Sequence, residues 1–192
     1  VSYCVWSLCN KNESSALIKS SCGKTSGWTV DDLTKAGQFI RNHYRSRMEN
    51  TAENNPEIKN LAPNITVSYK THVQTFGWEN EVSNGKMAGT VGSAKRLEGI
   101  TIRVSGDSNL GIRYKTHVQS YGWQDWKENG VMSGTTGEAK RLEAICIELT
   151  GANKDKYDVY YRVHAQTYGW LDWSKNGEMA GTEGLAKRLE AI

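Results

Sequence analysis

The strongest constraint on this chain is an internal repeat, because residues 67–100, 112–145 and 159–192 align without gaps. The first and second segments share 20 of 34 residues, and the second and third share 21 of 34. A unit this short cannot bury a hydrophobic face alone. We therefore expect three units, residues 65–106, 107–153 and 154–192, that share one core with pseudo-threefold symmetry. The third unit is expected to be truncated, since it stops at Ile192 where the others continue.

The pattern inside each unit predicts a mainly β fold. Ile112, Tyr114 and Val118 follow the even spacing of a half-buried strand. An Asn-Gly step predicts a tight hairpin turn, because both residues tolerate a positive φ. The alternating residues from Ile145 to Leu149 predict a core strand that closes the unit. A β-trefoil or a β-prism fits three such units, whereas a propeller with blades of similar length typically needs at least four.

Residues outside the repeats divide into two further regions. Residues 1–48 share nothing with the repeats, and Thr29–Leu33 predicts the start of a helix with Asp in its first turn. Residues 49–64 are polar and contain both prolines of the chain, which is typical of a linker. Val1 in place of an initiating Met indicates a processed or excised terminus. Residues 65–192 would then form an accessory domain.

Charge and hydropathy exclude two classes of partner. The 192 residues contain 24 Lys and Arg against 21 Asp and Glu, with the signs interspersed, whereas a nucleic-acid binder concentrates its basic residues on one face. No apolar run approaches the roughly 18 residues that a membrane span requires. We therefore expect neither nucleic acid as a partner nor a membrane span.

Tryptophan positions separate predicted scaffold from predicted surface. Trp78, Trp123 and Trp170, with His72, His117 and His164, occur in all three units, and we interpret them as scaffold in which the tryptophans are core residues. Trp126 and Trp173 differ, because the equivalent residue of the first unit is Glu81, an exchange that a core position rarely accepts. An exposed indole offers a flat apolar face to a pyranose ring. Trp126 and Trp173 are therefore candidate sugar platforms.

The cysteines and histidines do not predict a metal or cofactor. Cys4, Cys9 and Cys22 crowd the first 22 residues and Cys146 stands apart, without zinc-ligand spacing. They are interpreted as small buried thiols, with a disulfide within the first segment as the alternative. The three histidines could form a zinc triad only if their strands pointed toward the symmetry axis. The charge run at Lys140, Arg141 and Glu143 is either a solvated strand edge or a repeated salt bridge.

The first segment resembles the end of a glycoside hydrolase family 5 endoglucanase. The resemblance rests on the run Val1–Ala16, on Gly27 and Trp28, on Asp32–Thr34, and on Gly37 with Phe39–Arg41. It implies that residues 1–48 are the last strand and helix of a (β/α)₈ barrel. That family cleaves β-1,4-glucan with retention through two glutamates, which the resemblance places before Val1. This chain then holds no catalytic residue and is expected to be inactive alone.

The same resemblance implies substrate-binding residues within the chain. Trp6 is similar to the tryptophan that lies against the sugar at the cleavage site, at the substrate-binding end of the barrel. Lys11 and Glu13 are similar to residues that contact a more distant glucosyl unit. The spacing Trp-x₄-Lys-x-Glu carries this assignment.

The repeats resemble clostridial hydrophobic repeats with a conserved tryptophan. The matching motifs in the first unit are Tyr69–Trp78, Ala88–Thr90 and Arg96–Glu98. The resemblance implies a secreted protein attached to polysaccharide, to a cell surface or to a cellulolytic complex. Two hypotheses follow: an endoglucanase end whose repeats bind cellulose, another β-glucan or cell wall polysaccharide, or repeats that bind surface proteins and have no affinity for sugar.

Overall fold

The computed structural model describes residues 18–22, 30–34, 62 and 64–192 and divides the chain into two compact units, residues 1–59 and 60–192. The described part of the first unit contains a short 3₁₀ helix, η1 (Val30–Asp32), and a bridge between Ile18 and Leu33. Asp31 and Asp32 lie in the first turn of η1, as the sequence predicts. Most of the segment predicted as a barrel remnant lies outside the described residues, so that assignment stays a prediction.

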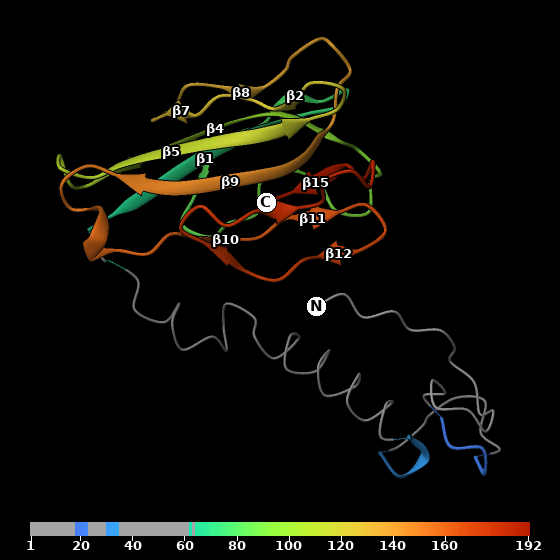
Figure 1. Cartoon of the computed structure of the whole chain (residues 1–192). Coiled ribbons are helices and arrows are strands. Elements are labelled where there is room, and N and C mark those ends of the chain that lie inside the picture. The colour runs from blue at the N-terminus through green and yellow to red at the C-terminus, as the bar shows by residue number, and fades with distance from the viewer. Residues whose placement is uncertain (1–17, 23–29, 35–61, 63) are drawn as a thin grey trace. The chain divides into compact units, whose positions relative to one another are not determined.

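The second unit is built from antiparallel β-strands, which confirms the mainly β prediction (Figure 1). The first repeat contains β1 (Thr66–Val73), β2 (Gly77–Trp78), β3 (Val82–Ser83) and β4 (Leu97–Ser105). The second contains β5 (Gly111–Val118), β6 (Gly122–Trp123), β7 (Lys127–Glu128), β8 (Ser133–Gly134) and β9 (Leu142–Thr150). The third contains β10 (Tyr160–Tyr161), β11 (His164–Ala165), β12 (Gly169–Trp170), β13 (Ser174–Lys175), β14 (Ala180–Gly181) and β15 (Leu189–Ala191).

Helical structure in the described residues is limited to η1 and a second 3₁₀ helix, η3 (Lys154–Lys156), in the connection between the second and third repeats. Within the part of the chain that is described, no helix has the length and apolar character needed to cross a bilayer.

The first two repeats each have one long central strand that pairs on both edges, whereas in the third repeat the equivalent stretch is divided into β10, which pairs with β13, and β11, which pairs with β12 and β15. In the second repeat, β5 pairs with β9 along its whole length on one edge and with β6 and β7 on the other. Side chains of β5 alternate strictly between half-buried and buried, so that one set faces the core and the other forms an outer face. The first repeat has the same arrangement, with β1 at its centre.

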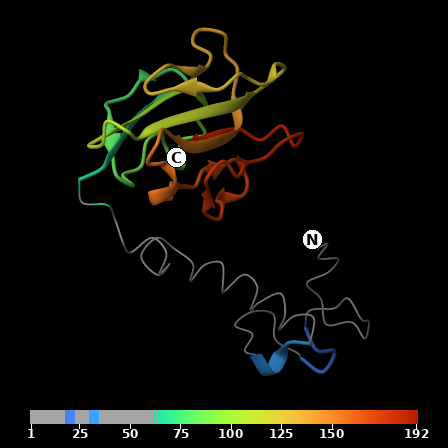
Figure 2. The ribbon, with the colours of Figure 1, turned by 60° about the vertical axis from the view of Figure 1, so that its left-hand side comes forward.

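Three seams join the repeats into a closed ring, and Figures 1 and 2 show the three repeats packed together. A seam is the pairing of the Ala/Ser-Gly-Thr segment of one repeat with the last strand of another. β8 pairs with β4, β14 pairs with β9, and Gly89 of the first repeat bridges to Ala191 of the third. Three units therefore close the ring, unlike a propeller of four or more blades. The choice between a β-trefoil and a β-prism stays a prediction.

The core draws buried residues from all three repeats, which confirms the shared-core prediction. Ile100, Ile145 and Leu189 are each 1% exposed and belong to one continuous hydrophobic cluster. Two tyrosines add polar links inside it. Tyr114 accepts a hydrogen bond from the Ile102 amide at 2.9 Å, and Tyr161 accepts one from the Ile147 amide at 3.0 Å. Each tyrosine thus joins its own repeat to the preceding one.

The Asn-Gly steps form turns as predicted, but not hairpins. Asn129 and Gly130 have φ values of 29° and 86°, and the other two steps are similar. The strands on either side do not pair with each other, because β7 pairs with β5 whereas β8 pairs with β4. The turn therefore sends the chain across a seam instead of back along the same sheet, and the hairpin prediction is wrong.

Candidate binding surface

A buried carboxylate held by an arginine recurs in every repeat. Glu143 is 5% exposed, and Arg141 donates to its Oε1 from Nε at 2.8 Å. The equivalent pairs are Arg96 with Glu98 and Arg188 with Glu190. A carboxylate removed from water needs such a partner to remain charged. The charge run is therefore a repeated salt bridge, which is one of the two readings of the sequence.

Each histidine lies between this carboxylate and the tryptophan of its own repeat. His117 Nδ1 is 3.0 Å from Glu143 Oε2. On its other side, the His117 ring meets the Trp123 ring edge to face, with centroids 5.5 Å apart. The same contacts recur at His72 and His164.

These tryptophans are not core residues, so that prediction is wrong. Trp78 is 38% exposed and Trp170 is 37% exposed, and Trp123 is half-buried. The reason is their position on β2, β6 and β12, which pair with the outer edge of the central strand. Cross-strand pairing places each tryptophan beside the histidine, on the outer face. The histidine–tryptophan pair therefore recurs in all three repeats although it lies on the outer face and not in the core.

Cations lie over the indoles and complete a row along the outer face of the second repeat. Arg113 and Lys115 project from β5 on the same side as His117. Lys115 Nζ is 5.0 Å from the Trp123 ring and 5.0 Å from the Trp126 ring, and Arg113 is 4.8 Å from Trp126. Indoles and cations therefore alternate along the strand.

The third repeat repeats this row with one cation between two indoles, and the first repeat lacks it. Arg162 lies 4.9 Å from Trp170 and 4.8 Å from Trp173. In the first repeat, Glu81 occupies the place of the second indole and forms a salt bridge with Arg103 at 2.6 Å. Trp126 and Trp173 are half-buried in this packing, not fully exposed as predicted, and the Trp173 Nε1 has no hydrogen-bond partner among the described residues.

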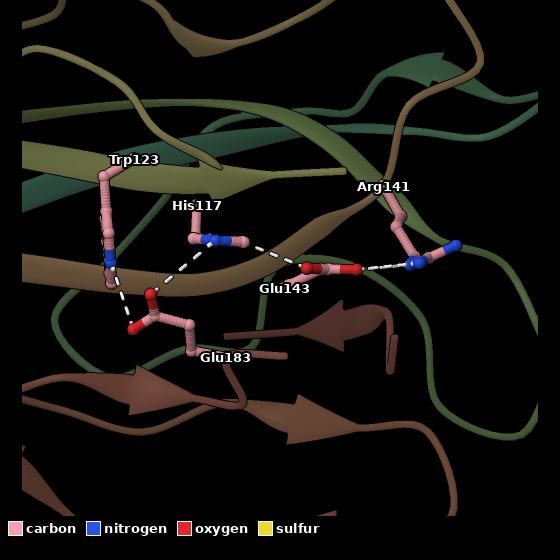
Figure 3. A network of polar contacts seen from close by, with 5 residues as sticks. All are labelled: His117, Trp123, Arg141, Glu143 and Glu183. Carbon is pink, nitrogen blue, oxygen red and sulfur yellow. Dashed lines mark hydrogen bonds and ion pairs between the residues drawn. The ribbon is translucent and has the colours of Figure 1, made fainter. Parts of the chain in front are cut away.

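A sixth side chain reaches the outer face of the second repeat across a seam. Glu183 belongs to the third repeat, and Figure 3 shows its carboxylate beside Trp123 and His117. Trp123 Nε1 donates to Glu183 Oε2 at 3.3 Å, and His117 Nε2 is 4.0 Å from Glu183 Oε1. Glu183 was not predicted as a site residue. The signal that could have found it is its difference from Val91 and Thr136, which occupy the same place in the other two repeats.

An open depression adjoins this row. It is lined by Trp123 and Gln124 together with Asp125, Lys127, Met132 and Gly134. Its walls come from the turn after β6 and from the seam strand β8. The depression therefore extends from the outer face of the second repeat to the seam.

The remaining predicted site residues divide by where they lie. Trp6, Lys11 and Glu13 are outside the described residues, as are Cys4 and Cys9. Cys146 is a buried free thiol, and Cys22 is a buried thiol whose Sγ is 3.7 Å from Asp32 Oδ1. Among the described residues, no three His, Cys, Asp or Glu side chains lie together as a set of metal ligands.

Known endoglucanases match part of this chain. It is 46% identical over 41 residues to an endoglucanase of Clostridium saccharobutylicum, which is 21% of this chain and 9% of that protein. It is 39% identical over 46 residues to endoglucanase N of Pectobacterium atrosepticum and to endoglucanase 5 of Pectobacterium carotovorum subsp. carotovorum. These matches span 24% of this chain and 10% and 9% of the two relatives. The resemblance to endoglucanases is thereby confirmed.

The repeats match a family directly. Residues 72–106, 117–151 and 164–192 each match clostridial hydrophobic W, so more than half of the chain is covered. No solved structure matches the chain. The chain belongs to the clostridial hydrophobic W family.

Proposed function

We propose that residues 60–192 form a non-catalytic attachment module of a secreted endoglucanase. The module holds the enzyme on cellulose, another β-glucan or cell wall polysaccharide. Tethering raises the local concentration of substrate without adding a contact at the reacting bond. The parent chain hydrolyses β-1,4-glucan with retention through glutamates outside this sequence, and Trp6, Lys11 and Glu13 bind glucosyl units in it. The names of the three relatives support this context.

The observation that carries the proposal is the alternation of indoles and cations on the outer face of the second and third repeats. Trp126 and Trp173 offer apolar ring surface, and Arg113, Lys115 and Arg162 offer hydrogen-bond donors within about 5 Å of those rings. A pyranose ring has an apolar C–H face and a rim of hydroxyl acceptors. A surface with both features at one site suits that ligand.

The second candidate is a protein-interaction or anchoring module without affinity for sugar. The cations favour it, because Arg162 and Lys115 already cover the indoles from which a sugar would gain most. Tryptophan and arginine together also dominate the energetics of protein interfaces. The two candidates use the same residues and differ only in the ligand.

Retention on insoluble ligands tests the proposal. The chain is mixed with cellulose, chitin or purified cell wall, and the bound fraction is compared with that of the Trp126→Ala/Trp173→Ala variant. Binding to one of these materials that falls in the variant supports polysaccharide attachment. Binding by the parent chain that is unchanged in the variant contradicts the role of these indoles, and no binding by the parent chain favours the protein-interaction candidate.

Catalysis is tested separately. The chain alone is expected to release no reducing ends from soluble cellulose, because retention requires two carboxylates about 5 Å apart on the two sides of the scissile bond. Measurable hydrolysis by the pure chain would overturn the assignment of the catalytic glutamates to the region before Val1.

A further inference from the structure

The three seams are built alike but are filled differently. In the middle seam, the Trp123 indole and the His117 imidazole face Glu183, the residue that follows the seam threonine of the next repeat. The threonine amide fixes this register, since Thr135, Thr182 and Thr90 donate to the carbonyls of Glu98, Glu143 and Glu190 at 2.7–2.8 Å. The following residues, Thr136, Glu183 and Val91, are therefore structurally equivalent.

Only the middle seam is filled by a carboxylate. Glu183 receives the Trp123 indole hydrogen bond at 3.3 Å and lies 4.0 Å from His117 Nε2. In the other seams, the Val91 side chain has no acceptor, and within the described part of the chain no hydrogen bond joins Thr136 to an indole. The indole N–H groups of Trp78 and Trp170 have no hydrogen-bond acceptor among the residues that the structure describes, and both rings are more than a third exposed.

We infer that the two open seams, at Trp78 with His72 and at Trp170 with His164, bind carboxylate side chains of an acidic protein partner. At each open seam, a carboxylate of the partner would occupy the place that the Glu183 carboxylate occupies in the middle seam. This goes beyond attachment to polysaccharide, because it uses different indoles from the Trp126 and Trp173 surface and a different class of ligand, although Arg162 borders both sites.

The surrounding charges favour an anion at both open seams. Lys70 Nζ lies 5.2 Å from the Trp78 ring, and Arg162 lies 4.9 Å from the Trp170 ring. The acidic groups beneath, Glu98 and Glu190, are already paired with Arg96 and Arg188 at 2.7–2.8 Å. An arriving carboxylate thus meets a half-buried cation and an N–H donor, whereas Glu98 and Glu190 are each already paired with an arginine.

The shape of the filled seam favours a protein side chain over a sugar acid. Glu183 reaches the indole at its N–H edge, and a cation, Lys115, lies over the same ring. The equivalent cations Lys70 and Arg162 lie over the open-seam indoles. A group that approaches the indole at its N–H edge needs only to be a narrow side chain that ends in a carboxylate, as Glu183 is. A uronate ring is bulkier at this point.

The test exchanges the seam residues. Indole Nε1–H resonances of the full chain, assigned by single Trp substitutions, are followed while a Glu-rich hexapeptide is added; a Gln-rich hexapeptide serves as the uncharged control. We expect the Trp78 and Trp170 signals to shift with the acidic peptide and the Trp123 signal to stay. The Thr136→Glu/Val91→Glu variant should bind the acidic peptide at least about tenfold more weakly, because each open seam then carries its own carboxylate.

The reciprocal variant is the matched control. Glu183→Thr should free the Trp123 indole and make its signal respond like the other two. All three positions are exposed, so thermal melts should remain unchanged. Equal shifts with the Gln-rich peptide, no shift of Trp78 and Trp170, or unchanged binding by the Thr136→Glu/Val91→Glu variant would each overturn the inference. Shifts with polygalacturonate but not with the peptide would also overturn it, in favour of an acidic polysaccharide. None of these outcomes depends on retention by cellulose.

Discussion

The three repeats are nearly identical in sequence where they form the seams, but they differ from one another on the outer face. At the seams, the three copies keep the same Gly, Thr, Arg and Glu, because backbone and buried charge must meet the neighbouring repeat at fixed distances. On the outer face, Glu81 stands where Trp126 and Trp173 stand, and at the exposed rim of the seams Val91 stands where Glu183 stands. Divergence between copies therefore marks the surface, where a ligand can be selected without disturbing the ring.

Repetition alone, however, does not mark burial. Trp78 and Trp170 recur in every copy and yet are 38% and 37% exposed. What holds them is their contact with His72 and His164 on the central strand. A residue can thus be kept in all three copies at the surface when each copy uses it in the same way.

The largest expected effect comes from breaking a seam. Gly134 has a φ of +104°, and a Cβ there would lie 2.4 Å from the Glu98 carbonyl oxygen and 2.8 Å from the Gly99 Cα. Both are backbone atoms of the neighbouring repeat, so they can yield only if β8 and β4 separate. We expect Gly134→Ala to lower the free energy of unfolding by about 2–5 kcal/mol, from overpacking and backbone strain together.

Gly137→Ala is the matched control for that substitution. Gly137 has a φ of +75°, and nothing lies within 4 Å of its added Cβ. This change should cost only the backbone strain, about 1–2 kcal/mol. Chemical denaturation of both variants measures the difference; equal losses would mean that the seam tolerates the added methyl group.

The next effect concerns the polar link between repeats. Tyr114 is fully buried, and its hydroxyl donates to the Val131 carbonyl at 2.5 Å while it accepts from the Ile102 amide at 2.9 Å. Tyr114→Phe leaves both groups without that partner, which should cost about 1–3 kcal/mol. Denaturant unfolding of Tyr114→Phe measures this loss.

Tyr69→Phe isolates the contribution of the link. Tyr69 is only half-buried, and its hydroxyl donates to the Lys86 carbonyl at 2.5 Å without accepting from an amide of another repeat in the described structure. The loss should therefore be smaller than for Tyr114→Phe. A larger loss at Tyr69 would show that the link across repeats adds no stability.

Alkaline pH should weaken the link that the buried tyrosine hydroxyls form between repeats. Burial raises the pKa of Tyr114 above its usual value near 10, and it raises that of Tyr161 further. In this pH range the unfolded state therefore loses the phenolic protons first, so stability is full below pH 10 and decreases as the pH rises through 10. Each tyrosine adds a slope of up to about 1.4 kcal/mol per pH unit. Melts of Tyr114→Phe should show a shallower decrease than the parent chain, and identical slopes would contradict this origin.

The sequence predicts the parts of this molecule that depend on local pattern. The three units, their strands and their shared core follow from spacing and repetition, whereas the salt bridge at Arg141 and Glu143 was one of two alternatives that the sequence left open. The hairpin prediction fails at Asn129 and Gly130 because a turn specifies how the chain bends and not which strand it pairs with next. Register across a seam depends on Gly134 approaching the Glu98 carbonyl, a contact between different repeats.

The candidate site was predictable to a lesser extent, since its contacts join positions far apart in the sequence. The exchange of Glu81 for Trp126 marks a variable surface position, but the cation over Trp126 comes from β5. The difference between Val91 in the first repeat and Glu183 at the equivalent position of the third was equally visible in the sequence. Its meaning depends on Trp123, which is a seam away and 60 residues apart from Glu183 in the chain.

The smallest effect on stability for each interaction removed, with the largest on binding, is expected at the outer indoles. The first repeat folds with Glu81 at their position, so Trp126→Ala/Trp173→Ala should lower the free energy of unfolding by about 0.5 kcal/mol for each of the three lost cation–π contacts. Retention on cellulose or cell wall should decrease at the same time. Glu81→Ala, which breaks only the exposed pair with Arg103, is the matched control and should leave both unchanged. If the indole variant melts far below the parent chain, Trp126 and Trp173 belong with the scaffold, and the division between seam and outer face does not extend to them.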